Sequence, residues 1–271
     1  MPELPEVETT KRGISPHLVN RVISRVDVRE RRLRWPVPRG FAQRIAGHKV
    51  LHITRRAKYL LFQLEHGYFM VHLGMSGSLR LAGANEPLLP HDHLIFHLPN
   101  GHSLRLNDPR RFGSALWLGQ QPEQHPLLRA LGPEPFAAAC SANYLFERSR
   151  KRKVAIKNFI MDNHIVVGVG NIYASEALFL SGIRPRRAAG RVSRAEYSLL
   201  LENIRTVLQA SIEQGGTTLR DFVGGDGKPG YFQQTLRVYG KAGIACTVCG
   251  TAIKQVAIGQ RSSFYCPACQ R

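Results

Sequence analysis

Two Cys-x-x-Cys pairs near the end of the chain are the sequence feature that most constrains its fold. Cys246 and Cys249 form the first pair, and Cys266 and Cys269 form the second after a spacer of 16 residues. Two such pairs at this separation are typical of a tetrahedral structural Zn2+ site. Four thiolates leave no coordination position open for chemistry, so this Zn2+ is expected to stabilise the fold. Disulfides are the alternative, and they are disfavoured in an intracellular chain.

The residues between the two pairs predict a β-hairpin. Residues 252–256 and 264–265 are the strand candidates, and residues 259–262 form the turn between them. Arg261 lies in that turn, where a basic side chain on a rigid hairpin can enter a DNA groove.

The net charge points to a polyanionic partner. Lys and Arg number 38 against 19 acidic residues, which gives a formal charge of +19. Nucleic acid is the first candidate and an anionic membrane surface the second, while a basic, merely solvated surface is the plain alternative. No apolar run approaches the roughly 20 residues of a membrane span, and the first residues lack the pattern of a signal peptide. A soluble, cytoplasmic protein is therefore expected.

The chain opens with Met-Pro-Glu-Leu-Pro-Glu-Val-Glu, which can place a reactive amine at its N-terminus. Removal of Met1 exposes the secondary amine of Pro2, and an α-amine titrates near pH ~8, so part of it is neutral at neutral pH. Such an amine attacks carbonyl-like carbon and yields an iminium that stays charged. Glu3 beside it can donate or accept a proton. A frayed terminus is the alternative, but a helix predicted over residues 5–13 would hold the amine in a fixed position just before its first turn.

Residues 19–118 are rich in short β-strands. The strand candidates are residues 22–28, 50–53, 59–64, 68–73, 94–98, 103–106 and 115–118. Asn100-Gly101 is a strong signal for a hairpin turn. Short strands separated by Gly, Pro and Asn predict a β-sandwich or a flattened barrel.

Two segments of this region place unusual side chains beside strands. Residues 55–58 (Arg-Arg-Ala-Lys) put three cations at the start of an apolar strand. Lys58 has the same strand parity as the apolar residues at positions 60, 62 and 64, so it is expected to face a cleft rather than open water. Residues 72–77 (His-Leu-Gly-Met-Ser-Gly) form a glycine-bracketed turn that presents Met75. The ordinary interpretation of Met75 is a gap-filler in a core.

A third segment, residues 108–113 (Asp-Pro-Arg-Arg-Phe-Gly), carries Arg110, Arg111 and Phe112 on one turn. An exposed loop with one buried ring is the plain interpretation. The alternative is a wedge, in which the apolar side chain separates base steps and an arginine takes the vacated space.

Proline-rich residues 120–135 predict a domain boundary, after which the hydrophobic period becomes helical. Residues 148–153 and Lys157 place six cations within ten residues at the start of an expected helix. They are interpreted as phosphate-facing, although a solvated charge run is the usual explanation. Asn171 follows two glycines and is expected to cap a helix whose free N–H groups attract phosphate.

The last part of this region predicts a long helix and a loop. Ser193 and Glu196 have the spacing of a capping box, and the helix is expected to end near Gln214. Residues 215–231, which include six glycines, predict a flap over a ligand or a disordered loop.

Taken together, these motifs resemble the formamidopyrimidine-DNA glycosylase family of bacterial base-excision enzymes. The resemblance covers nearly the whole chain and is carried by residues 2–9, 55–61, 72–77, 108–113 and 169–176 and by the terminal zinc hairpin.

The resemblance implies an α+β fold with an N-terminal β-sandwich that begins with a helix. The implied domains are residues 1–125 for the catalytic sandwich, 126–235 for a helix-two-turn-helix DNA-binding domain, and 236–271 for the zinc hairpin. Residues 216–230 are the implied lesion-capping loop, and DNA is expected between the domains.

The resemblance also implies a bifunctional glycosylase and AP lyase that removes oxidised purines, 8-oxoguanine and formamidopyrimidines, by Schiff-base chemistry followed by β,δ-elimination. The implied catalytic residues are Pro2 as nucleophile, Glu3 as its proton-transfer partner, Lys58 as a proton donor and Arg261 in the δ-elimination. The implied DNA-binding residues are His72, Met75, His91, Arg110, Arg111, Phe112, Lys153 and Asn171, of which Met75, Arg110 and Phe112 fill and wedge the gap left by an everted nucleotide. Thr217 and Thr218 lie in the implied lesion loop.

The expected partners are one structural Zn2+ and damaged double-stranded DNA, bound by a monomer without a membrane. Two alternatives stay open at this point. An endonuclease VIII-like enzyme for oxidised pyrimidines is the nearer one, although Leu4 and residues 110–112 favour the purine branch by resemblance. A zinc-ribbon DNA-binding protein without catalysis explains the charge and the cysteines, but not Pro2-Glu3 or Lys58.

Overall fold

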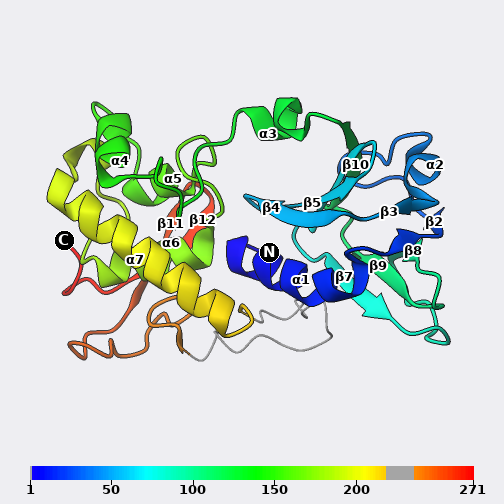
Figure 1. Cartoon of the computed structure of the whole chain (residues 1–271). Coiled ribbons are helices and arrows are strands. Elements are labelled where there is room, and N and C mark those ends of the chain that lie inside the picture. Colours follow the sequence, from blue (N-terminus) through cyan, green and yellow to red (C-terminus); the bar gives the residue numbers. More distant parts are fainter. Residues whose placement is uncertain (1, 218–234) are drawn as a thin grey trace. The chain divides into compact units, whose positions relative to one another are not determined.

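The structure is a computed structural model that describes residues 2–217 and 235–271. These residues divide into two compact units, whose elements are labelled in Figure 1. The first unit comprises residues 2–129 and 212–217, and the second comprises residues 130–211 and 235–271. Among these residues, none of the helices combines the length and the hydropathy that crossing a membrane requires.

The first unit consists of a leading helix and antiparallel sheets. Its elements are α1 (Leu4–Leu18), β1 (Val22–Ile23), β2 (Arg25–Val28), α2 (Phe41–Ile45), β3 (His48–Lys49), β4 (His52–Arg56), β5 (Tyr59–Leu64), β6 (Gly67–His72), β7 (Ser78–Ala82), β8 (Asp92–His97), β9 (Ser103–Asn107), β10 (Ser114–Gly119), the 3-10 helix η1 (Pro122–Gln124) and α3 (Pro126–Arg129). The two four-stranded sheets have the orders β10-β6-β5-β4 and β2-β8-β9-β7, and β1 pairs with β3.

Apolar residues from both four-stranded sheets form one core. Phe62 of β5 stacks on Phe69 of β6 with ring centroids 4.5 Å apart, and Phe69 stacks on Phe96 of β8 at 5.5 Å. The row of rings therefore crosses from one sheet to the other. Such an inner layer is the mark of a sandwich, and it confirms the fold class predicted for the N-terminal region.

Helix α1 packs on β4, β5 and β7 (Figure 1) and is longer than predicted. It continues through Pro16 to Leu18. Pro16 lies in the last turn, where its missing N–H removes a single hydrogen bond. Ile14 and Leu18 are fully buried and lie one turn apart, so burial of this apolar face outweighs that loss.

The second unit consists of helices and the terminal hairpin. Its elements are α4 (Ala142–Ser149), α5 (Ile156–Met161), α6 (Asn171–Leu180), the 3-10 helix η2 (Ala189–Arg191), α7 (Arg194–Glu213, whose last two residues belong to the first unit), β11 (Lys254–Ile258) and β12 (Arg261–Tyr265). Phe179 of α6 packs with Ile253 and Phe264 in a small separate core around the cysteines.

Two local expectations for this unit have different outcomes. The capping box of α7 is confirmed, because the Glu196 N–H donates to Ser193 Oγ at 3.2 Å and the Ser193 N–H donates to Glu196 Oε2 at 2.8 Å. The single helix expected from the basic run is wrong: α4 ends at Ser149 and α5 begins at Ile156. Lys151 between them takes a left-handed φ of 62°, which interrupts a helix.

Candidate active site

The start of α1 fixes the two residues that precede it. Glu3 is the N-cap residue and is 2% exposed. Its N–H donates to Glu6 Oε2 at 2.8 Å, and the two glutamates form a reciprocal capping box. Pro2 is buried beside Glu3. The capping box therefore holds Glu3, and with it the neighbouring Pro2, at the start of α1.

The other carboxylate oxygen of Glu6 reaches a distant part of the chain, a contact that the sequence did not reveal. Glu6 Oε1 accepts the N–H of Thr217 at 2.8 Å. Gly216 takes φ +86°, and a Cβ there would lie 3.3 Å from Glu6 Oε1. The buried carboxylate of Glu6 therefore connects the start of α1 to Thr217, which lies 211 positions later in the chain. Thr218 and the rest of the predicted lesion loop after Thr217 lie outside the described residues.

The three cations of residues 55–58 have different environments. Arg55 Nε lies 3.1 Å from Glu8 Oε2 and thereby ties β4 to α1. Burial of Glu8 opposes its ionisation, but the hydrogen bonds and charges of Lys11 and Arg55 outweigh this effect and hold the pKa of Glu8 below its usual value. Lys58 lies half-buried in the turn between β4 and β5, after Ala57 with a left-handed φ of 53°.

Two loops approach closely and present Met75 and Phe112. Gly74 has φ +65°, and a Cβ at this position would lie 2.4 Å from the backbone carbon of Phe112. Only glycine fits this approach. His72 ends β6 just before this turn, and its Nδ1 lies 3.0 Å from the Gly74 N–H.

Asp108 joins these two loops. It is fully buried; Oδ1 accepts the Ser76 hydroxyl at 3.1 Å, and Oδ2 accepts the Gly113 N–H at 2.7 Å. The Asp108 N–H donates to the carbonyl of His91 at 3.1 Å, and His91 is an exposed residue with φ 70°. The spacing between the two loops is thus set by one carboxylate.

Asp108→Asn is expected to lower the free energy of unfolding by about 1–3 kcal/mol, because the neutral amide has one acceptor oxygen, so the charge is lost and the hydrogen bond from either the Gly113 N–H or the Ser76 hydroxyl must be broken or reversed. Urea unfolding measures the change. Asp27→Asn is the matched control, since Asp27 lies on β2 with its side chain 38% exposed. Equal stability of the two variants would contradict the role of Asp108.

The tips of these loops are exposed. Met75 and Phe112 are each 40% exposed, and the guanidinium of Arg110 lies 4.8 Å from the centroid of the Phe112 ring. Arg111 points elsewhere: its Nη1 lies 3.5 Å from Glu30 Oε2. Its assignment as a DNA-binding residue stays a prediction, in competition with this ion pair.

Lys157, grouped by sequence with the phosphate-facing cations, is instead buried at 1% exposure. Its Nζ donates to Asn171 Oδ1 at 2.6 Å, to the Ser262 carbonyl at 3.1 Å and to Ser263 Oγ at 2.7 Å. Three acceptors compensate a buried ammonium. Lys153, by contrast, is exposed in the segment before α5.

Asn171 is connected through this contact to Ser262, the residue that follows Arg261 in the chain. Asn171 is the first residue of α6, and the N-cap is Gly170 rather than Asn171 as predicted, because the amide side chain of Asn171 bonds Lys157 and the Ser262 carbonyl at 3.0 Å. Arg261 opens β12 directly after the two-residue turn Gly259-Gln260, and both turn residues have positive φ. Arg261 is exposed.

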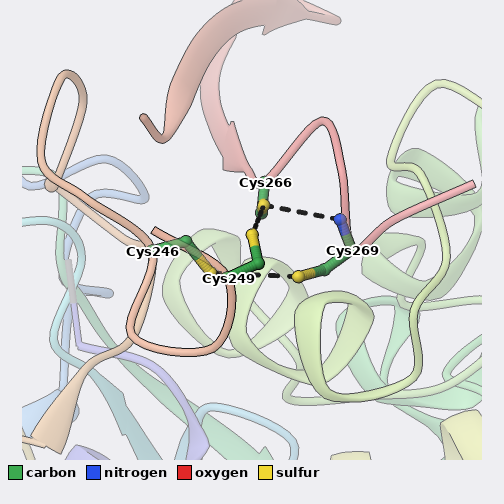
Figure 2. Close-up of side chains that lie close together, drawn as sticks. All are labelled: Cys246, Cys249, Cys266 and Cys269. Carbon is green, nitrogen blue, oxygen red and sulfur yellow. Dashed lines mark hydrogen bonds between the residues drawn. The ribbon is translucent and has the colours of Figure 1, made fainter. Parts of the chain in front are cut away.

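The four C-terminal cysteines converge as predicted. Their sulfur atoms all lie within 4.8 Å of one another, and Figure 2 shows them pointing toward a common centre. Sγ of Cys246 lies 3.9 Å from that of Cys269, and Sγ of Cys249 lies 3.4 Å from that of Cys266. A Zn2+ with bonds of about 2.3 Å sets tetrahedral edges of about 3.8 Å. The residues therefore fit one Zn2+.

The cysteine cluster is anchored to the helices by side chains that the sequence did not reveal. Gln270, fully buried, accepts the Cys266 N–H at 2.8 Å and donates to the Ile183 carbonyl at 2.8 Å. The carboxylate of Glu176 accepts three successive backbone N–H groups, those of residues 237–239, at 2.8–3.0 Å. These long-range contacts carry no local signal in the sequence.

Known families match the chain in three consecutive segments. The formamidopyrimidine-DNA glycosylase N-terminal domain matches residues 1–115, the H2TH domain of formamidopyrimidine-DNA glycosylase matches residues 131–223, and the zinc finger found in FPG and IleRS matches residues 243–271. The formamidopyrimidine-DNA glycosylase of Thioalkalivibrio sulfidiphilus is 59% identical over 271 residues, which covers both chains completely. The chain belongs to the formamidopyrimidine-DNA glycosylase family.

Solved structures of formamidopyrimidine-DNA glycosylases share the whole fold. The MutM (Fpg) protein of Thermus thermophilus superposes with a TM-score of 0.90 at 36% identity, covering 99% of this chain and 98% of that one. Wild-type Lactococcus lactis Fpg (MutM), in complex with a DNA that contains N7-benzyl-Fapy-dG, superposes with a TM-score of 0.92 at 32% identity and full coverage of both chains.

Family membership confirms several predictions at once. The α+β fold class, the enzyme class and the zinc hairpin are all confirmed. A zinc-ribbon protein without catalysis is wrong as an alternative, because the match extends over the entire chain. The predicted domain boundaries stay predictions; the zinc hairpin and the helices before it fall in one compact unit.

Proposed function

We propose that this chain excises oxidised purines, 8-oxoguanine and formamidopyrimidines, from duplex DNA and then cleaves the strand, with Pro2 as its nucleophile. The observation that carries the proposal is the burial of Pro2 and Glu3 at the start of α1, where the Glu6 carboxylate accepts the Glu3 N–H. Membership in the formamidopyrimidine-DNA glycosylase family supports the reaction class.

The chemistry follows from the two residues after Met1. Once Met1 is removed, the Pro2 nitrogen attacks C1′ of the damaged nucleotide, and the bond from C1′ to the base breaks. Glu3 protonates the sugar-ring oxygen as the ring opens, and a C1′ iminium forms. The iminium acidifies the C2′ hydrogen, so the 3′ phosphate leaves by β-elimination and the 5′ phosphate by δ-elimination. The product is a one-nucleotide gap, and Lys58 and Arg261 are the proposed proton donors.

A base inside a duplex is out of reach, so the nucleotide must first be everted at a cost of a few kcal/mol. Met75, Arg110 and Phe112 are the proposed wedge. They are exposed on two loops whose spacing is fixed by Asp108, and an apolar side chain at such a tip can replace the lost stacking.

The remaining predicted residues are proposed to bind the DNA backbone and the lesion. The proposed contacts to DNA are His72, His91, Arg111, Lys153, Asn171 and Arg261, with Thr217 and Thr218 at the lesion. A formal charge of +19 supports binding through phosphates. We further propose that the enzyme acts as a monomer on chromosomal DNA in the bacterial cytoplasm, since one set of these residues serves one lesion.

Cleavage of two matched duplexes tests the lesion class. An 8-oxoguanine:C duplex should be nicked at least tenfold faster than a thymine glycol:A duplex of the same sequence, which corresponds to a difference of about 1.4 kcal/mol in activation free energy. The product should carry phosphate at both ends of the gap. An undamaged duplex is the blank. Faster cleavage of the thymine glycol duplex would assign the chain to pyrimidine lesions instead.

A further inference from the structure

Two basic segments of the second unit lie side by side. Residues 184–191, between α6 and α7, include four arginines and run antiparallel to residues 151–157. Three backbone hydrogen bonds join the two: the N–H of Ile156 to the carbonyl of Arg187 at 2.7 Å, that of Ala189 to Val154 at 2.8 Å, and that of Gly190 to Arg152 at 2.9 Å. These two ranges are called the paired segments below.

The paired segments expose cations that the protein does not neutralise. Six of their cations are exposed, and none has a carboxylate within 4.0 Å in the part of the chain that the structure describes. They are Lys151, Arg152, Lys153, Arg184, Arg186 and Arg191. Arg187, by contrast, pairs with Glu196, with Nη2 3.0 Å from Oε2. Like charges so close in the chain repel one another, and a bound polyanion would relieve that repulsion.

One end of the paired segments is attached to the zinc hairpin. Arg186 Nη2 donates to the Ala257 carbonyl at 3.3 Å. Ala257 pairs with Ser262 in the register of β11 and β12, and Ser262 directly follows Arg261. The exposed cations therefore continue from the tip of the hairpin, at Arg261, along the paired segments toward Arg191.

The composition of this surface fits phosphates better than a protein partner. Val154, 40% exposed, is the one large apolar side chain exposed in the paired segments. Protein interfaces have an apolar or aromatic centre, whereas contacts to a nucleic-acid backbone need cations alone. Arg186 and Arg191 are five residues apart, so their Cα atoms lie at most about 18 Å from each other. That distance is the rise of about five base pairs.

We propose that the paired segments bind the phosphates of about five base pairs of undamaged duplex next to the hairpin contact, with Arg186 and Arg191 as the main contacts. The proposal deepens the proposed function and rests on it for the identity of the polyanion. Neither arginine has a part in the chemistry, so the surface adds affinity for long duplexes. Four arginines within eight residues were a signal in the sequence that could have found it.

Duplex length separates this surface from the contacts at the lesion. Three uncleavable duplexes carry a tetrahydrofuran site: one of about 11 base pairs, and two extended by about six pairs on the 5′ or the 3′ side. The natural chain should bind one extended duplex about tenfold more tightly than the short one. Equal affinity for all three would overturn the proposal. Excision of 8-oxoguanine from the short duplex tests the proposed function separately, because the paired segments are not needed there.

Variants of the two arginines test the contact itself. Arg186→Gln and Arg191→Gln should each raise the Kd of the favoured duplex about threefold and reduce its slope of log Kd against log salt by about 1. The double variant should bind all three duplexes equally. Arg191→Lys keeps the charge and should keep the slope. Arg194→Gln is the matched control, since Arg194 is exposed in the same unit but its Nη2 lies 3.2 Å from Glu147 Oε1, so the slope should not change.

Three outcomes would contradict the proposal. The first is an unchanged slope in both Arg186→Gln and Arg191→Gln, and the second is an equal loss of affinity on the short and the extended duplexes. The third is a loss of binding to polyglutamate with no change on any duplex, which would assign the surface to an acidic protein segment. Arg186→Gln should retain its Zn2+, which shows that its effect does not come from a disrupted hairpin.

Discussion

A chain with one alanine inserted between Met1 and Pro2 is expected to bind lesion duplex and leave it uncut. The insertion converts the Pro2 nitrogen into an amide, whose lone pair is delocalised and cannot attack C1′. The covalent complex trapped by borohydride on 8-oxoguanine duplex should fall by at least about 10³-fold, equivalent to about 4 kcal/mol of activation free energy.

Two controls separate chemistry from binding in this experiment. The Kd of the inserted chain for a tetrahydrofuran duplex should stay close to that of the natural chain, because the proposed wedge and phosphate contacts are unchanged. Pro2→Gly restores a free amine at the same place and should trap more than the inserted chain but far less than Pro2. Efficient trapping by the chain with the alanine insertion would show that Pro2 is not the nucleophile. An active natural chain whose measured mass still includes Met1 would show the same.

The parts of this molecule that were predictable are those encoded by short-range patterns. The Cys246-to-Cys269 pattern, the Asn100-Gly101 hairpin and the capping box at Ser193 each depend on residues close together in the chain, so their geometry follows from spacing alone. The helix start beside Pro2 and Glu3 belongs to the same class, because a helix start depends on residues close together in the chain; the roles proposed for these two residues stay predictions.

The parts that were not predictable depend on which distant residues meet. Glu6 contacts Thr217 across 211 positions, and Asp108 contacts Ser76 across 32. Nothing in the local sequence distinguishes these carboxylates from solvated ones.

The environment of a charged side chain was the second feature that the sequence predicted wrongly. Lys157 stands in a basic run but is buried against Asn171, and its ammonium is kept in the core by three acceptors. The sequence shows the sign of a side chain's charge. Only the packing decides whether that charge pairs with a phosphate or with groups of the protein itself.

Cys266→Ala is expected to abolish zinc binding and thereby to weaken DNA binding strongly. Cys266 is fully buried in the small core with Phe264, and its N–H is held by Gln270. Structural Zn2+ contributes about 10–16 kcal/mol in zinc-finger peptides, which equals or exceeds the total stability of a typical domain, about 5–15 kcal/mol. A hairpin of two five-residue strands cannot replace that contribution.

Loss of the hairpin should extend to the residues that depend on it. Ser262 and Ser263 of β12 provide two of the acceptors of the buried Lys157, and the Ser262 carbonyl also orients Asn171. Arg261 is next to them in the chain. Unfolding the hairpin therefore removes Arg261, leaves a buried ammonium with fewer acceptors and releases the Asn171 side chain, so the Kd for duplex should rise by at least about 10²-fold through lost phosphate contacts.

Metal analysis and duplex binding on one preparation measure this prediction. The natural chain should hold one Zn2+ per molecule and Cys266→Ala none. Cys140→Ala is the matched control: Cys140 is equally buried but lies outside the cluster, so this variant should keep its zinc and its affinity and lose only the small amount of stability that a deleted sulfur costs. If both variants bound duplex equally well, the hairpin would carry no part of the DNA interface, and Arg261 would have to be withdrawn from the δ-elimination as well as from binding.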